Sequence, residues 1–366
     1  MLGGVMGISR EVFDSRIQEN DEQGIVGFTQ KLVADLEAGF QAINDTLFPW
    51  LEKLSKRKFR GVLCLGMGGS AAGGDFLATL SRHEGDVPVV VHREYFIPNW
   101  LDDSWLVIAT SHSGNTEETI SSAEAAAKIG CEVIAISTGG MLAGLCERYP
   151  NMHLVPSIGG QPPRTAFGHI FSRQLGILRS LDILPSLSIG EEKSLLERLS
   201  IANSKFDITT GDEFDLLSIA NDLVDRNIAI WGPTELDCCV NRFKNQINEN
   251  SARFVRVGII PEMNHNESVA WGGVGTDQDS MVEHQALFVL THEELSPRVM
   301  KRFDWMVGHL GTKAAWKLNA EGATLLEKQL YLCILMDWVS IALAFVLGKD
   351  PGAIGPINSL KEYLDD

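Results

Sequence analysis

The amino-acid sequence predicts an α/β protein built from two doubly wound parallel sheets, with a helical N-terminal lead-in and a helical C-terminus. Short runs of Val, Ile and Leu alternate with segments of helical periodicity, which is the pattern of βαβ units. The pattern occurs in both halves of the chain, and several of the apolar runs end in glycine- or hydroxyl-rich loops. Because no linker of Pro, Gly and Ser separates the halves, we expect two closely packed domains.

The composition excludes several classes of protein. The 366 residues are 45% hydrophobic, enough for two cores, and the net charge of −17 argues against nucleic-acid binding. The six cysteines lack metal-ligand spacing, which favours reduced cysteines in a cytoplasmic protein and no metal site. No signal-peptide pattern begins the sequence. Asp337 and Ser340 interrupt the most apolar stretch, residues 330–347, so we expect a buried helix and no membrane partner.

Four segments are expected along the chain. They are a helical lead-in that packs on the core (1–57), a first α/β domain (58–185), a second α/β domain (186–350) and a C-terminal tail (351–366). Strands are predicted at 61–65, 88–91, 107–110, 131–137, 227–231, 254–260 and 286–290, and helices at 117–129, 166–181, about 297–309 and 321–347.

The loop after the apolar run 107–110 is the strongest indication of a binding site. Ser111, Ser113 and Thr116 surround Gly114, and a helix is predicted to begin at Glu117. The first turn of a helix has unpaired amides and a partial positive charge, so it binds phosphate readily, and the hydroxyl groups add donors. The alternative is an ordinary N-cap, which needs only one hydroxyl group. Three hydroxyl groups exceed that need, so the loop favours phosphate binding.

A second strand, loop and helix unit covers residues 61–79. Its Gly66-Met67-Gly68-Gly69-Ser70-Ala71 fits the dinucleotide fingerprint G-x-G-x-x-A, and Glu94 follows near the position of a ribose-binding acid. The sequence therefore leaves a nicotinamide-dependent dehydrogenase open. A nicotinamide site has no use for a second loop rich in hydroxyl groups, so the two loops together favour a compact sugar phosphate.

Four further residues carry groups suited to proton transfer or charge stabilisation. Arg164 follows two prolines that fix the backbone, and Glu249 lies between Asn248 and Asn250, as a general base would. His265 titrates near neutral pH, and Lys361 is close to the C-terminus. Each has a simpler interpretation: a surface salt bridge for Arg164, a solvated Glu249, an incidental histidine and a mobile terminal lysine.

Taken together and in order, these motifs resemble one family, the bifunctional phosphoglucose/phosphomannose isomerases, whose members have two sugar-isomerase (SIS) domains of flavodoxin-like fold. The resemblance runs from about residue 58 to the C-terminus. His112 stands where the family pattern has Tyr, and Ser137-Thr138-Gly139-Gly140 matches only approximately. The matching motifs are Gly68-Gly69-Ser70, Ser111-x-Ser113-x-x-Thr116, Pro162-Pro163-Arg164, Asn248-Glu249-Asn250, Glu262-Met263-x-His265-Asn266 and the terminal Lys361.

The resemblance implies an isomerase, free of metal and cofactor, that interconverts glucose 6-phosphate and mannose 6-phosphate with fructose 6-phosphate through a cis-enediol(ate). In this family pattern Glu249 is the base, His265 and Lys361 assist ring opening, and Arg164 stabilises the enediolate. The implied ligands of the 6-phosphate are Gly69, Ser70, Ser111, Ser113 and Thr116.

The resemblance also implies a cytoplasmic homodimer acting in glycolysis and gluconeogenesis on small sugar phosphates. Two alternatives stay open: a non-catalytic regulator that binds sugar phosphates, and an isomerase that acts on one hexose phosphate only. The motifs do not decide the preferred epimer, nor whether His265 serves its own subunit or the neighbouring one.

Overall fold

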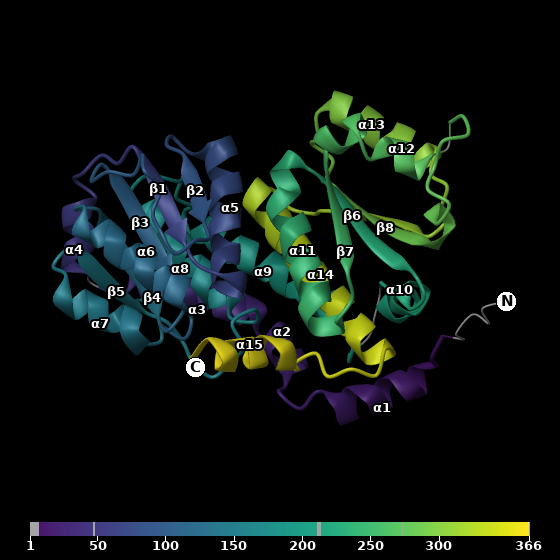
Figure 1. The fold of residues 1–366 in the computed structure, drawn as a ribbon, viewed down its shortest axis with the longest axis horizontal. Coiled ribbons are helices and arrows are strands. Elements are labelled where there is room, and N and C mark those ends of the chain that lie inside the picture. The colour runs from purple at the N-terminus through teal and green to yellow at the C-terminus, as the bar shows by residue number, and fades with distance from the viewer. Residues whose placement is uncertain (1–6, 47, 211–213, 273, 366) are drawn as a thin grey trace. The chain divides into compact units, whose positions relative to one another are not determined.

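The computed structural model describes residues 7–46, 48–210, 214–272 and 274–365 and confirms the α/β fold. Its contacts divide the chain into two units (Figure 1). The first unit is Lys31–Ser200, and the second unit joins Met1–Gln30 to Ile201–Asp366. The boundary at residue 200 lies inside one helix, α9 (Ile189–Phe206).

The first unit contains a five-stranded parallel sheet in the order β2-β1-β3-β4-β5. The strands are β1 (Gly61–Leu65), β2 (Val89–His92), β3 (Trp105–Thr110), β4 (Glu132–Ser137) and β5 (Met152–Pro156). Strands β1 and β3 pair in register from Gly61 with Trp105 to Leu65 with Ala109. The strand order reverses between β1 and β3, and ligands of such sheets bind at the carboxyl ends of the strands beside that reversal.

Helices cover both faces of this sheet, because every residue of its mainly apolar strands β1, β3 and β4 is buried. Helix α8 is buried along nearly its whole length and packs against α3. The helices of the first unit are α3 (Leu32–Asn44), α4 (Pro49–Leu54), α5 (Gly68–Glu84), α6 (Glu117–Lys128), α7 (Gly140–Arg148) and α8 (Phe167–Ser180).

The second unit contains a four-stranded parallel sheet in the order β7-β6-β8-β9. The strands are β6 (Asn227–Pro233), β7 (Val255–Ile260), β8 (Gln285–Thr291) and β9 (Ala315–Asn319). Three short 3₁₀ segments follow strands or precede them: η1 (Thr234–Leu236), η2 (Glu262–His265) and η3 (Val282–His284). The helices are α1 (Arg10–Asn20), α2 (Ile25–Gln30), α10 (Leu216–Leu223), α11 (Asp237–Ser251), α12 (Ser268–Trp271), α13 (Pro297–Gly308), α14 (Leu325–Val346) and α15 (Gly355–Asp365).

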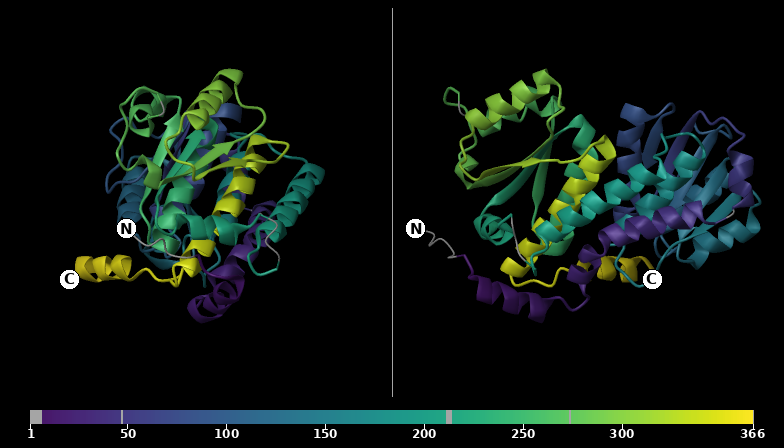
Figure 2. Two further views of the ribbon diagram at one scale, coloured as in Figure 1. Left: turned by 90° about the vertical axis from the view of Figure 1, so that its right-hand side faces the viewer. Right: turned by 180° about the vertical axis from the view of Figure 1, so that it is seen from behind.

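Helix α14 is the centre of the second unit. It is long and apolar enough to cross a membrane, but 94% of its most apolar window is buried inside the protein, which confirms the predicted buried helix. Thr324 caps it by accepting a hydrogen bond from the backbone of Glu327. Helices α1, α10 and α11 pack against it (Figure 2).

The observed units differ from the predicted segments in the lead-in. Residues 1–30 belong with the second half of the chain, whereas α3 and α4 belong with the first half. Helix α1 packs on α14 through Phe13, which is fully buried. The centroids of the Phe13 and Phe345 rings are 6.3 Å apart, in an edge-to-face arrangement. The strongly amphipathic α3 packs instead on α8. Periodicity predicts that a helix has a buried face, but not which core buries it.

Two strands, β5 and β9, were not predicted. Both lie at a sheet edge, where one side of the strand has no neighbour. Most of their residues are partly buried or exposed, and β5 ends in Pro156 while β9 contains Lys317. Edge strands carry such residues because they need neither full burial nor a complete hydrogen-bond ladder. An apolar run is therefore a poor guide to them.

Candidate active site

Two predicted loops meet at the β1/β3 reversal of the first unit. The 66–70 loop follows β1 and leads into α5, and the 111–116 loop follows β3 and leads into α6. The backbone N–H of His112 donates to the Ser70 hydroxyl at 3.2 Å, so the loops are joined directly. Both helices begin with amides that have no acceptor within the helix. The sequence-predicted phosphate loops therefore lie side by side at the place where this fold binds ligands.

The hydroxyl of Ser111 organises the second loop. It accepts hydrogen bonds from the backbone N–H groups of Gly114 at 3.1 Å and Thr116 at 3.4 Å, and it lies 2.8 Å from the Thr116 hydroxyl. Ser111 is fully buried, whereas Ser113 is exposed and Thr116 is half-buried. Ser111 thus fixes the loop, and Ser113 presents its hydroxyl group to solvent.

The ordinary N-cap interpretation does not hold for Thr116. This residue is the N-cap of α6, yet its side chain accepts no hydrogen bond from the first turn of the helix. Its hydroxyl group contacts Ser111 instead. Because capping does not consume it, the start of α6 keeps its amides available for an anion.

Close backbone contacts hold the loop in shape. Gly114 has φ +74°, and a Cβ atom there would lie 1.8 Å from the carbonyl oxygen of Gly139. The side chain of Asn115 accepts from the backbone of Met141 at 3.1 Å, and Thr138 donates to the carbonyl of His112 at 2.7 Å. The segment 138–141, whose sequence only approximates the family pattern, therefore supports the hydroxyl-rich loop from β4.

Arg164 lies beside the first loop. A Cβ atom at Gly69 would lie 2.8 Å from the backbone nitrogen of Arg164 and from the carbonyl of Pro163, so the two segments touch through their backbones. Arg164 is 3% exposed. Its interpretation as part of a surface salt bridge is therefore wrong, and the glycine is required by this close approach.

Two neutral histidines lie behind the loops. The rings of His112 and His169 are 5.9 Å apart, and His112 Nε2 lies 3.0 Å from the carbonyl of Gln161. Burial lowers the pKa of His112, and burial with the nearby Arg173 lowers the pKa of His169 to about 3. Neither ring carries charge at neutral pH. Neither ring therefore offers a positive charge to an anion in this unit.

Glu249 lies in the last turn of α11 in the second unit and is half-buried. A carboxylate at a helix C-terminus is disfavoured by the helix dipole, by about 0.3–1 kcal/mol at exposed positions. The neighbouring amides hold the end of the helix. The side-chain amide of Asn248 donates hydrogen bonds to the carbonyls of Lys244 and Arg253. Asn250 donates to the Ser340 hydroxyl at 2.9 Å. Both fix the end of the helix.

A buried polar network anchors α11 to α14. Asp337 on α14 accepts from Arg242 at 2.6 Å and from Gln246 at 2.9 Å, while Ser251 donates to the carbonyl of Ser340. The α11 residues 242, 246 and 250 recur every four positions and so share one face. Glu249 lies three positions after Gln246 and thus close to the same face, on a helix whose rotation is fixed by the network.

His265 and Lys361 lie on two other elements of the second unit. His265 ends η2 and is exposed, and Lys361 is exposed on α15. The predicted site residues thus fall into two groups: Gly69, Ser70, Ser111, Ser113, Thr116 and Arg164 in the first unit, and Glu249, His265 and Lys361 in the second. Within the described ranges, no group of three or more His, Cys, Asp or Glu is arranged to hold a metal ion.

Sequence reasoning missed the supporting residues of the 111–116 loop. Asn115, Gln161 and His169 were not predicted, although Asn115 lies within the loop itself. Their contacts join segments far apart in the chain, so nothing in the local sequence signals them. His112, noted only as a departure from the family pattern, is one of the buried members of the site.

Comparison with known proteins identifies the fold. Residues 215–364 match the family model described as the bacterial phospho-glucose isomerase C-terminal SIS domain. The C-terminal domain of glucosamine-fructose-6-phosphate aminotransferase from Francisella tularensis shares the fold, with a TM-score of 0.69 and 13% identity over 89% of this chain and 98% of that one. The family-model match and the shared fold define a protein of the SIS-domain class.

Sequence relatives identify the family within this class. The bifunctional phosphoglucose/phosphomannose isomerase of Aquifex aeolicus is 31% identical over 87% of this chain and 94% of that one, and several others carry the same name. A shorter match, 31% identical over 55% of this chain and 61% of that one, is to the D-glucosamine-6-phosphate 4-epimerase of Sulfolobus acidocaldarius. The chain belongs to the bifunctional phosphoglucose/phosphomannose isomerase family.

Proposed function

We propose that this protein interconverts glucose 6-phosphate and mannose 6-phosphate with fructose 6-phosphate through a cis-enediol(ate). The observation that carries the proposal is the meeting of two phosphate loops at the β1/β3 reversal, in a chain of this family. The loops expose backbone amides and neutral hydroxyl groups, which suit the 6-phosphate common to the three sugars.

The proposed chemistry assigns one task to each group. His265 and Lys361 assist opening of the sugar ring, and Glu249 carries a proton between C1 and C2. Arg164 stabilises the negative charge of the enediolate, as an electrostatic catalyst does. Glucose and mannose phosphates differ only at C2, which is planar in the enediolate, so one base serves both epimers. These roles rest on the family resemblance, and the anchoring of α11 supports the role of Glu249.

The first test is turnover of each aldose phosphate by the purified protein. We expect fructose 6-phosphate to form from both glucose 6-phosphate and mannose 6-phosphate. Formation from one alone would restrict the protein to a single hexose phosphate, and binding without turnover would favour a regulator. D-Glucosamine 6-phosphate belongs in the same series because of the epimerase relative, and its exclusive conversion would overturn the proposal.

The second test replaces the base. Glu249→Gln keeps the size of the side chain but cannot accept the proton, so both activities should fall together by at least about two decades in kcat, the usual contribution of a general base. KM should change little, because the carboxylate acts mainly in the transition state. Lys244→Gln, on the same helix, serves as a control. Survival of one activity near the wild-type level would rule out a shared base.

We further propose that the protein is a cytoplasmic homodimer without nucleic-acid or membrane partners. All six cysteines are unpaired, which is consistent with a reducing compartment. The dimer rests on the family resemblance alone, and sedimentation at several protein concentrations tests it.

A further inference from the structure

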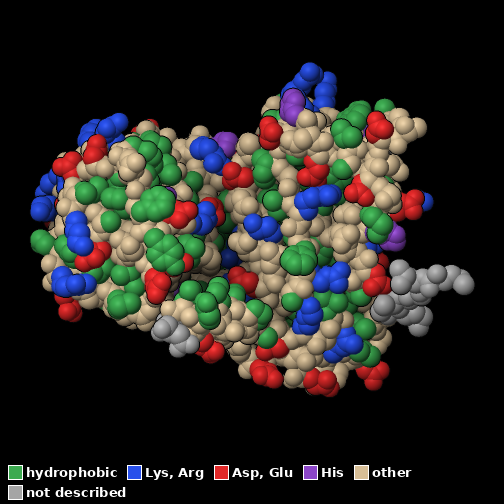
Figure 3. Space-filling view, viewed as in Figure 1, with side chains coloured by type: hydrophobic (Ala, Val, Ile, Leu, Met, Phe, Trp, Pro, Cys, Tyr) green, Lys and Arg blue, Asp and Glu red, His purple; other side chains and the backbone are tan. Residues whose placement is uncertain are grey.

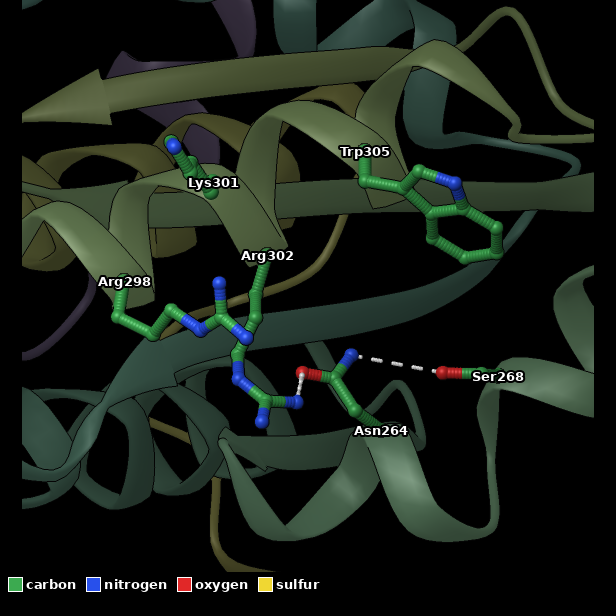
Figure 4. A pocket seen from close by; sticks show the side chains of 6 residues that line it. All are labelled: Asn264, Ser268, Arg298, Lys301, Arg302 and Trp305. Carbon is green, nitrogen blue, oxygen red and sulfur yellow. Dashed lines mark hydrogen bonds between the residues drawn. The ribbon is translucent and has the colours of Figure 1, made fainter.

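A basic pocket lies on the second unit, between α13 and the segment formed by η2 and α12. Its volume is about 520 Å³, within the range of small-molecule sites, and it is lined by Asn264, Ser268, Arg298, Lys301, Arg302 and Trp305 (Figure 4). The four residues from α13 have the spacing i, i+3, i+4, i+7 and therefore share one helix face. Phe303 and Met306, on another face, pack into the core.

The charge of this pocket is unusual for the molecule. The chain carries 48 acidic and 31 basic residues, yet this face of α13 presents three cations (Figure 3). Among the residues that the structure describes, no carboxylate forms an ion pair with Arg298, Lys301 or Arg302. The adjacent Glu267 is engaged by Arg256 at 3.2 Å and by Trp271 at 2.8 Å.

The side chain of Arg302 reaches Asn264, and that of Arg298 extends toward Arg302 (Figure 4). Two guanidinium groups that approach each other repel, and an anion between them relieves that repulsion. Guanidinium groups also match the geometry of phosphate oxygens better than ammonium groups do. The arrangement therefore favours a phosphate group at this point.

The polar groups of the pocket are only weakly satisfied by one another. Arg302 donates to Asn264 at 3.4 Å, Asn264 donates to Ser268 at 3.4 Å, and Ser268 donates to the thioether of Met306 at 3.3 Å. Ordinary hydrogen bonds are about 0.4–0.5 Å shorter than the first two, and a thioether is a weak acceptor. These donors are available to a better acceptor.

Trp305 forms an aromatic wall of the same pocket. Its side chain is 48% exposed, and one face stacks on His309 at 4.5 Å. An exposed indole beside two guanidinium groups matches a ligand that joins a flat ring to a phosphate group. We propose that this pocket binds a small organic phosphate carrying a planar ring, of the nucleoside phosphate class, apart from the phosphate loops of the first unit.

The test uses the indole N–H resonance of Trp305 in the full-length protein, assigned with Trp305→Phe, and ADP as the probe. We expect ADP to shift this resonance saturably, and pyrophosphate, which has no ring, to bind at least about fivefold more weakly, because stacking on an aromatic ring contributes about 1–3 kcal/mol. Arg298→Gln with Arg302→Gln should weaken ADP binding at least about tenfold. The response should persist in Ser113→Ala, which separates this pocket from the phosphate loops of the first unit.

A matched control has the same change in net charge. Lys313 and Lys317 are exposed cations elsewhere on the second unit, so Lys313→Gln with Lys317→Gln should leave the response to ADP within about twofold of wild type. The proposal is overturned if ADP does not move the resonance, or if both double variants lose the response equally. Equal affinity for ADP and pyrophosphate overturns the role of Trp305. A resonance that responds to protein concentration alone would assign this face to a second copy of the chain instead.

Discussion

Single side chains at the β1/β3 reversal divide into those that shape the loops and those that face solvent. Ser111 is buried and holds the loop, whereas Ser113 is exposed and accepts a hydrogen bond from the backbone of Asn115 at 3.3 Å. The sequence predicts that hydroxyl groups gather here because their type and spacing are local properties. It does not predict which of them are buried, because burial depends on β4 and the 138–141 segment.

Replacing Ser113 tests the solvent-facing hydroxyl group. Ser113→Ala should weaken inhibition by a non-reactive sugar 6-phosphate by roughly one to two decades, since a hydrogen bond to a charged group contributes about 1.5–3 kcal/mol. The loss should be similar for all three substrates, because all present the same phosphate. Ser121→Ala, on the exposed side of α6, is the control. An unchanged inhibition constant would place the phosphate elsewhere.

Replacing Gly69 tests the close approach to Arg164. The methyl group of Gly69→Ala would collide with the backbone of Pro163 and Arg164, so one of the two segments must move. We expect sugar 6-phosphate binding to weaken at least about tenfold, measured by calorimetry. Gly144→Ala adds the same methyl group to a helix of the same unit with no atom within 4 Å and should leave binding unchanged. Equal binding by both variants would show that the 162–164 turn adapts freely.

Among the elements, α8 joins the loops to the core. It carries His169, whose ring lies near His112 and whose Nδ1 lies 3.2 Å from the Ser157 hydroxyl. Its predicted range, 166–181, agrees with the observed Phe167–Ser180 because apolar periodicity is strong in a buried helix. The lowered pKa of His169 could not be predicted from the sequence, because it depends on desolvation and on the proximity of Arg173, which arise only in the packed structure.

The lowered pKa of His169 predicts a pH dependence of stability. Below pH 6.5 the unfolded chain binds a proton on this histidine, whereas the folded protein binds it only near pH 3. The contribution of the neutral ring is therefore present above pH 6.5 and is lost as the pH falls toward 3. In urea unfolding from pH 7.5 to 5, the free energy of unfolding should fall less steeply for His169→Gln than for wild type. His83→Gln is the control, and parallel curves for wild type and His169→Gln would contradict the prediction.

For the whole molecule, the main difference from the predicted organisation is that both ends of the chain belong to one unit. Arg16 donates to the carbonyl of Phe345, 329 positions away, and Gln23 donates to the carbonyl of Gly352 at 2.9 Å. Local patterns predict helices and strands one at a time, so the α/β class and the two sheets are predictable. The contacts of residues 7–30 with α14 are not predictable, because an apolar helix face does not specify which core it packs against.

This organisation predicts that Phe13 stabilises the second unit. Phe13→Ala leaves a cavity against Phe345 and should lower the free energy of unfolding of that unit by about 3–5 kcal/mol. Limited proteolysis should then cut within residues 201–366 before residues 31–200. Val12→Ala, on the exposed side of the same helix, should change stability by less than about 0.5 kcal/mol. First cleavage within residues 31–200 would show that α1 stabilises the other unit.

The closing of the second unit by its two chain ends also affects biosynthesis. Residues 31–200 are complete as soon as they leave the ribosome, so the first unit is able to fold while translation continues. Helix α1 is synthesised before α14 and cannot dock until α14 is available. At a translation rate of roughly 5–20 residues per second, the 329 positions between Arg16 and Phe345 take about 16 to 66 s. During that time Phe13 lacks its contact with Phe345, so α1 is synthesised long before the helix on which it docks.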